Sequence, residues 1–172
     1  MNRATFNSAK PLDMNVNRNT LDETPLIVAS RDGDLQTVCK LMENESLDVN
    51  LSDSSGRTSL YFACKRNHFH VVEKLINHPN IDVNRRPKYG MYAPLYYAAL
   101  NDQHIETVGE HLKHPNIDVN VLESYRETPI YCTTSFGNYR VVRELLNHDR
   151  AMSTKSGYAA AHHSTSRVAE VV

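Results

Sequence analysis

One heptapeptide, HPNIDVN, occurs twice in this chain without any change, at residues 78–84 and again at residues 114–120. The same longer pattern precedes each copy: Thr-Pro-Leu or a near variant, a small residue five positions after the Thr, then a Val and a Leu/Ile pair. The pattern begins at Thr24, Thr58, Ala93 and Thr128, at intervals of 34, 35 and 35 residues. Self-similarity at this period predicts a stack of small units instead of one globular core.

Each unit is predicted to hold two short helices, and the second unit illustrates why. Thr58 stands at an N-cap position, where its hydroxyl can accept from N–H groups of the first helical turn. Asn67 follows this helix and tolerates the left-handed geometry of a turn. Val72 and Leu75–Ile76 then form an apolar stripe at helical spacing. A single unit cannot bury this stripe, but a stack of units can.

The combined pattern of T-P-L-x-x-A, a Gly or Asn turn, V-x-x-L-L and D-V-N-x-x-D-x-x-G is similar to the ankyrin repeat. The resemblance covers roughly residues 15–172 in four successive registers. It implies an all-α fold, an α-solenoid of helix-turn-helix-hairpin repeats. We expect four full repeats, a polar and frayed segment at residues 1–14, the tail of an incomplete unit at residues 15–17, and a partial repeat from about residue 157.

Composition narrows the classes of function. The chain has 172 residues, 40% of them hydrophobic, and a formal net charge of −1 with acids and bases mixed. This mixture argues against binding to nucleic acid or to an anionic membrane, and no apolar run is long enough to span a bilayer. Three cysteines, none in a Cys-x-x-Cys pair, suit a reducing compartment. We therefore expect a cytoplasmic monomer, and a nuclear location is compatible with the sequence.

Catalytic motifs are missing from the sequence. It holds no Gly-rich phosphate loop, no nucleophile elbow and no His-Glu-x-x-His, so we expect no enzymatic activity and no cofactor. The nine histidines suggest a metal site, but His78, His114 and His148 recur at one repeat position just after the second helix. An imidazole there can hydrogen-bond the last helix carbonyls. Structural capping is therefore favoured over metal binding.

The third unit departs from the pattern at several points. Ala93 replaces the capping Thr, and Gly109 falls inside the second helix; each change costs about 1 kcal/mol. Extra residues lie near 90–92 and within 101–104. His111 takes a position that is Leu in other units, so the sequence predicts that His111→Leu raises thermal stability. The unit has either drifted within a tolerant repeat or forms a soft joint that a partner reshapes.

Aromatic residues mark two neighbouring positions of the first helices. The first position carries Ile27, Tyr61, Tyr96 and Tyr131, which we expect to bridge neighbouring repeats. The second carries Val28, Phe62, Tyr97 and Cys132, on the side that lines the concave face in ankyrin-like stacks. For Phe62 and Tyr97, packing between repeats is an equal alternative to contact with a partner.

Residues of the helix ends and hairpin loops complete the candidate partner-binding set. Tyr, Arg and Met are the types enriched at protein interfaces. The full set is Phe62, Lys65, Arg66, Arg85, Arg86, Lys88, Tyr89, Met91, Tyr92, Tyr97, Tyr125 and Arg126. We interpret Asn50, Asn84 and Asn120 as side chains that fix their own turns; the resemblance also implies that such asparagines can be hydroxylation targets.

The function expected from these features is non-catalytic protein recognition. The concave face and hairpin tips would bind a protein or peptide whose acidic or tyrosine-compatible patches face Arg85, Arg86 and Lys88. Two alternatives remain at this point. The chain could be part of a larger adaptor or effector whose activity lies in a C-terminal domain beyond Val172, or it could be a structural spacer or decayed copy.

Overall fold

The computed structural model describes residue 17 and residues 23–88, 92–121 and 128–156. In these ranges the chain forms eight α-helices, one short 3-10 helix and no strand. The helices are α1 (Pro25–Asp32), α2 (Leu35–Met42), α3 (Ser59–Lys65), α4 (Phe69–Ile76), α5 (Pro94–Ala99), η1 (Asp102–His104), α6 (Ile105–Lys113), α7 (Pro129–Ser135) and α8 (Tyr139–Ser156). The expected all-α fold is confirmed.

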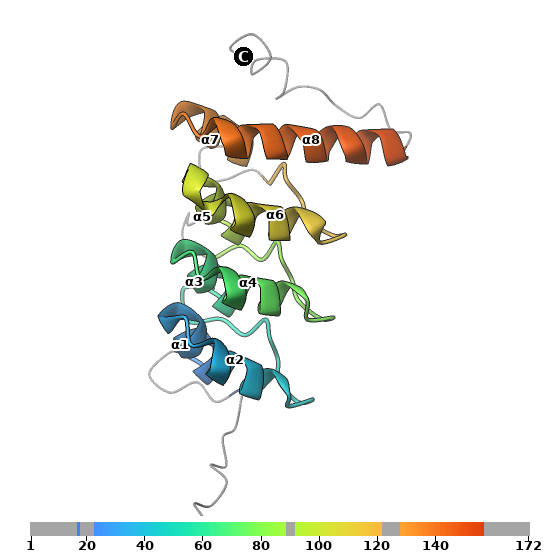
Figure 1. Ribbon diagram of the computed structural model, residues 1–172. Helices are drawn as coiled ribbons and strands as arrows, with labels where there is room; N and C mark the ends of the chain where they lie inside the picture. The colour runs from blue at the N-terminus through green and yellow to red at the C-terminus, as the bar shows by residue number, and fades with distance from the viewer. Residues whose placement is uncertain (1–16, 18–22, 89–91, 122–127, 157–172) are drawn as a thin grey trace, which may run out of the picture.

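The helices form two layers of a stack (Figure 1). The first helices of the units, α1, α3, α5 and α7, contact one another in that order, and the second helices α2, α4, α6 and α8 do the same. Each unit thus packs against the units before and after it, as in a solenoid. The partial repeat expected from residue 157 lies outside the described residues.

Threonine caps start three of the four first helices, as the sequence predicts. The hydroxyl of Thr24 accepts from the backbone N–H of Ile27 at 3.2 Å, and that of Thr58 accepts from Tyr61 at 3.3 Å. Thr128 caps α7 in the same way. Ala93 begins α5 without a side-chain cap, which confirms that the third unit lacks this interaction.

The turns between the paired helices also follow the prediction in three units. Gly33 has a φ of 76°, Asn67 a φ of 54° and Gly137 a φ of 73°, all in the left-handed region. The third unit instead contains η1, where the side chain of Asn101 accepts from the N–H of Gln103 at 2.9 Å. The extra residue there is accommodated by one tighter turn of helix.

The buried residues divide into two main clusters, one in the first two units and one in the last two. Val72 and Leu75 of α4 are fully buried in the first cluster, and Val108 and Val141 are fully buried in the second. Ile117 packs against both clusters. The apolar stripes of the second helices are therefore buried by stacking, as the repeat pattern requires.

Asparagine side chains bridge successive units. The amide of Asn50 donates to the carbonyl of Asn80 at 2.6 Å, and its Oδ1 accepts from the N–H of Asp82 at 2.8 Å. Asn84 makes the same pair of bonds to the following unit, and Asn17 makes it to the unit that begins the described chain. The interpretation that Asn50 and Asn84 fix their own turns is therefore wrong. The aspartate two residues earlier accepts from the asparagine N–H and fixes the turn instead.

The histidines after the second helices act differently from the prediction. Nδ1 of His78 accepts from the N–H of Asn80, and Nδ1 of His114 accepts from the N–H of Asn116, each at 3.2 Å. These imidazoles fix the HPN turn and do not donate to helix carbonyls through Nδ1. His148 lies inside α8 and not after it. The predicted carbonyl caps are therefore wrong, although the role stays structural.

His111 is a well-satisfied residue of the interior. It is fully buried, and its Nδ1 lies 2.9 Å from the carbonyl oxygen of Thr107. Nearby, the hydroxyl of Thr107 donates to Oδ1 of Asn67 at 2.7 Å, which joins the second and third units. Both ring nitrogens have a partner, since Nε2 lies 3.4 Å from Sγ of Cys64, and the effect of His111→Leu on thermal stability stays a prediction.

Neither a metal site nor a membrane span is found within the described ranges. No group of three or more His, Cys, Asp or Glu side chains there could hold a metal ion. None of the described helices has the length and apolar character needed to cross a membrane.

Candidate protein-binding surface

Phe62 belongs to the interior more than to the surface. Its side chain is 7% exposed and packs with Ile27 and Tyr61, while Tyr97 is half-buried against this group. Of the two roles that the sequence allowed, packing between repeats therefore describes Phe62. Tyr97 presents part of its ring to solvent, so packing between repeats and contact with a partner are both compatible with its position.

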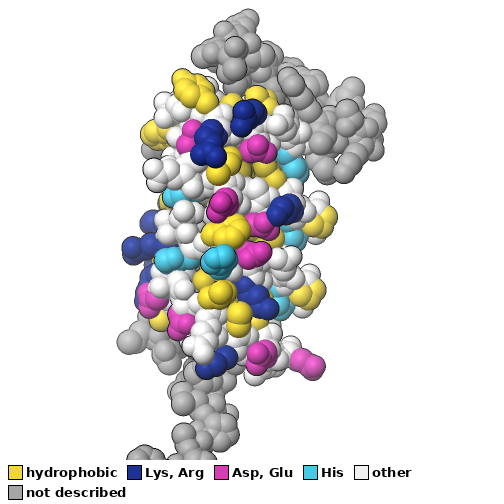
Figure 2. Space-filling view, viewed as in Figure 1, with side chains coloured by type: hydrophobic (Ala, Val, Ile, Leu, Met, Phe, Trp, Pro, Cys, Tyr) yellow, Lys and Arg dark blue, Asp and Glu magenta, His cyan; other side chains and the backbone are white. Residues whose placement is uncertain are grey.

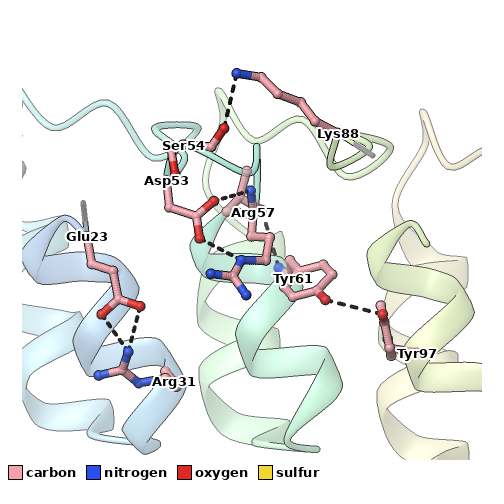
Figure 3. A network of polar contacts seen from close by, with 9 residues as sticks. Glu23, Arg31, Asp53, Ser54, Arg57, Tyr61, Lys88 and Tyr97 are labelled. Carbon is pink, nitrogen blue, oxygen red and sulfur yellow. Dashed lines mark hydrogen bonds and ion pairs between the residues drawn. The ribbon is translucent and has the colours of Figure 1, made fainter. Parts of the chain in front are cut away.

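The aromatic rings of the second and third units hold one another in place. The ring of Tyr61 meets Phe62 edge to face at 5.2 Å between centroids and Tyr97 in the same way at 5.0 Å. The hydroxyl oxygens of Tyr61 and Tyr97 lie 3.2 Å apart, at hydrogen-bond distance (Figure 3). Burial, and then the bond to Tyr97, raise the pKa of Tyr61, so its phenol is neutral.

Tyr92 extends this arrangement toward the hairpin loop. Its ring stacks on Tyr96 with 3.8 Å between centroids and 8° between planes, and it meets Tyr97 edge to face. Burial is the main cause that raises the pKa of Tyr96, followed by a hydrogen bond with Cys132. Tyr92 is half-buried, so it acts as a packed ring with one accessible side.

The bridging position of the first helices behaves as expected in three units. Ile27, Tyr61 and Tyr96 are buried between repeats. Tyr131 is 53% exposed, because no helix pair follows α7 and α8 in the described part of the chain. At the next position Val28 is 37% exposed and Cys132 is buried.

Two cationic side chains lie over the aromatic rings. Nζ of Lys65, at the end of α3, is 5.4 Å from the centroid of Tyr97 and 5.7 Å from that of Tyr61. Cζ of Arg57 lies 4.9 Å from the centroid of Phe62. Lys65 belongs to the set expected from the sequence, whereas Arg57 does not. The sequence does hold a signal for Arg57, because Arg57 stands directly before the capping Thr58, at a position that recurs in each unit.

Arginine–carboxylate pairs flank these rings in the first two units (Figure 3). Nε of Arg57 is 2.6 Å from Oδ2 of Asp53, whose other oxygen accepts from the Arg57 N–H at 2.8 Å. The Asp53 side chain is 0% exposed and that of Arg57 is 32% exposed. Arg31 holds Glu23 in the unit before, at 2.6 Å. The carboxylate of Asp53 is hidden, and the guanidinium that neutralises it is on the surface.

The loop cations play different roles. The N–H of Lys88 donates to the carbonyl of Ser55 at 2.7 Å, and its Nζ donates to that of Ser54 at 3.2 Å, so Lys88 ties two neighbouring loops together (Figure 3). Arg66, Arg85 and Arg86 are exposed. Tyr89, Met91, Tyr125 and Arg126 lie outside the described residues.

The accessible side chains around the packed ring of Phe62 define one candidate site, which we call the first-helix surface: Arg31, Arg57, Lys65, Tyr92 and Tyr97. They come from α1, α3, α5 and the segments just before α3 and α5. In the space-filling view, Lys and Arg side chains lie at the middle of the edge formed by the first helices, with Asp and Glu side chains further along that edge, and the second-helix face is mixed in charge (Figure 2). Hydroxylation of Asn50, Asn84 or Asn120 stays a prediction.

Comparison with known proteins identifies the repeat. Residues 3–87 match the family model described as ankyrin repeats (3 copies). The chain is similar to osteoclast-stimulating factor 1 of Bos taurus, with 37% identity over 64 residues that make up 37% of this chain and 29% of that protein. It is also similar to Rabankyrin-5 of Mus musculus, with 36% identity over 69 residues, which are 40% of this chain and 6% of that protein.

The chain thus spans less than a third of the length of these relatives. The matched residues end near the loop that closes the second unit, and the structure continues the same helix pair through two further units. Ankyrin repeats generally serve as protein–protein interaction modules. The matched part of the chain therefore consists of ankyrin repeats, and the described helix pairs fold as an all-α ankyrin solenoid.

Proposed function

We propose that this protein is a non-catalytic recognition module that binds a protein or peptide partner through the first-helix surface. The observation that carries the proposal is the position of Lys65, which is exposed yet held over the rings of Tyr61 and Tyr97. A cation placed on a packed aromatic cluster offers charge, apolar area and hydrogen-bonding groups at one site. Tyr and Arg anchors of this kind dominate the energetics of protein interfaces.

Preorganisation supports the same proposal. Tyr61, Phe62 and Tyr97 fix one another by edge-to-face contacts, and Asp53 fixes Arg57 by two hydrogen bonds. Side chains that are already ordered lose less conformational entropy when a partner binds. The exposed Arg85 and Arg86 of the neighbouring loop extend the surface toward the hairpin tips. A reducing, intracellular location agrees with the three free cysteines.

A position-specific cross-linking experiment tests this proposal. Val28 on α1 and Leu35 on α2 are a matched pair, because both are aliphatic and 37% and 36% exposed, one on each layer of the stack. Each is replaced in turn by a photo-reactive phenylalanine, and the protein is irradiated in a cell lysate. We expect a discrete cross-linked partner from position 28 and not from position 35, and its loss when Tyr97→Ala is added.

Circular dichroism and urea unfolding must first show that each variant is folded. Equal cross-linking from positions 28 and 35 would move the interface off the first helices. The absence of any product from position 28 would contradict the proposal.

We propose as a second candidate that the chain is the recognition part of a longer adaptor. The residues it shares with the two relatives above make up only 29% and 6% of those proteins, which favours this candidate. Transcript sequencing beyond the codon for Val172 tests it. An open reading frame that continues into a further domain is the expected result, and an immediate stop codon would contradict it.

A further inference from the structure

We infer that the partner segment bound by the first-helix surface is acidic, with carboxylates that pair with Lys65 and its neighbours in the stack. This inference rests on the proposed function and specifies its partner. Two features carry it: the sign of the charge that this surface presents to solvent, and the way its cations are spaced along the units.

The exposed charge of the surface is positive in its central part. Lys65 and Arg66 are adjacent and exposed, and neither forms an ion pair with an acidic side chain in the described ranges. Arg57 has a carboxylate partner, but the Asp53 side chain is 0% exposed while that of Arg57 is 32% exposed. An approaching molecule therefore meets the guanidinium and not the carboxylate.

The cations are available to a carboxylate without loss of the structure that holds them. A cation over an exposed ring is stabilised by only about 0.5–1 kcal/mol, so Lys65 can add an ion pair while its stem stays on Tyr97. Nη groups of Arg57 remain for a second acceptor, because Asp53 is bonded through Nε and the backbone N–H. A charge-assisted hydrogen bond to a carboxylate is the natural use of such donors.

Spacing along the stack favours an extended segment. Arg31, Arg57 and Tyr97 lie in a row across α1, the start of α3 and α5 (Figure 3), and Lys65 lies between the rings of the last two units of this row. A peptide that crosses the units would meet Arg31 with its partners Glu23 and Asp32 in the first unit, the cations Arg57 and Lys65 in the second, and aromatic area in the third. A basic peptide on the same path would be repelled.

The opposite layer shows no such bias. A shallow hollow of about 400 Å³ between α4 and α6 is lined by Phe69, Gly109 and three charged side chains, Glu106, Glu110 and Lys113. Lys113 pairs with Glu110, so acids outnumber bases there. An acidic segment would thus be directed to the first helices and away from the second.

Selection from a displayed library of random 12-residue peptides, on the intact chain at low salt, tests the inference. We expect the enriched peptides to carry an excess of Asp and Glu. The affinity of a selected peptide should fall about tenfold in Lys65→Glu, as expected for reversing one charge at an ion pair, and should weaken as salt is raised. Lys74→Glu is the matched control, because Lys74 is exposed in the last turn of α4 in the same unit.

The outcomes separate the two proposals. Peptides without an acidic excess that are lost with Tyr97→Ala would overturn the acidic class and leave the recognition surface standing. Peptides unaffected by both Lys65→Glu and Tyr97→Ala would overturn the surface itself. Equal loss in Lys65→Glu and Lys74→Glu, or a library that yields no binder, would also count against an acidic partner.

Discussion

The imidazole of His111 lies against the thiol of Cys64 inside the stack, with Nε2 3.4 Å from Sγ. Both side chains are fully buried, one on α6 and the other on α3. A carbonyl can only accept, so Nδ1–H of His111 donates to Thr107, and Nε2 is left to accept from the Cys64 S–H. This contact joins the second unit to the third, and burial lowers the pKa of His111 and keeps the ring neutral.

The His111–Cys64 contact predicts a pH dependence of stability. Burial lowers the pKa of His111 from 6.5 to about 4. Between these two values the unfolded chain binds a proton that the folded chain does not, so stability is full above pH 6.5 and is lost as pH falls toward 4. The loss from this group is about 3 kcal/mol in order of magnitude.

The variant His111→Leu isolates this effect from the other histidines. Near pH 7 we expect its free energy of unfolding to lie within about 1 kcal/mol of the parent protein, because lost hydrogen bonds offset the gain in apolar burial. Near pH 4 it should be clearly the more stable. Urea denaturation at several pH values measures the difference. A constant difference across this range would show that His111 titrates normally. We therefore expect the stabilisation that the sequence predicts to appear only under acid conditions.

Gly109→Ala is predicted to stabilise the protein. A Cβ at position 109 would meet no atom within 4 Å, and the residue lies inside α6, so alanine should add about 1 kcal/mol through its higher helix propensity. Gly33→Ala is the opposing control. Gly33 has a φ of 76°, and a Cβ there would lie 2.8 Å from the ring of His68, so that variant should lose more than about 1 kcal/mol. Thermal unfolding of both variants measures whether each gains or loses stability, and a lower melting temperature of Gly109→Ala would contradict the prediction.

Restoring a threonine cap at the third unit should also stabilise it. Ala93 has a φ of −63° and a ψ of 160°, close to the backbone of the capping Thr24, and both precede a proline. We expect Ala93→Thr to add about 1 kcal/mol. Hydrogen exchange of the α5 amides measures the local effect. The variant Ala93→Val, which has a similar shape and no hydroxyl, is the control and should give no gain.

The asparagine bridges predict a graded loss of stability. Asn84→Ala removes two hydrogen bonds to the next unit, which should cost about 2 kcal/mol at about 1 kcal/mol for each bond. Asn84→Asp keeps an oxygen that accepts from the Asp118 N–H and loses the N–H that donates to the Asn116 carbonyl. Apart from charge repulsion, its loss of unfolding free energy should therefore lie between those of the parent protein and Asn84→Ala. Asn120→Ala is the control, because within the described ranges the Asn120 side chain bonds no following unit. Equal costs for Asn84→Ala and Asn120→Ala, by urea unfolding, would contradict the bridging role.

The sequence alone determined the repeat, the helix pairs and their ends. A threonine cap, a left-handed turn residue and an apolar stripe are local signals, and each acts through bonds within a few residues. For this reason the sequence pattern predicts the roles of Thr58 and Asn67 correctly, and the lack of a side-chain cap at Ala93 follows from the residue type itself.

Which side chains face a neighbouring unit follows from the packing of the units against one another and not from the sequence pattern. Asn50 and His111 carry polar groups that find their partners one unit away, in Asn80 and Cys64, and no local pattern encodes those distances. The same holds for the first-helix surface. The burial of Asp53 leaves the guanidinium of Arg57 as the exposed charge, and the sign of that surface follows from stacking and not from the sequence composition.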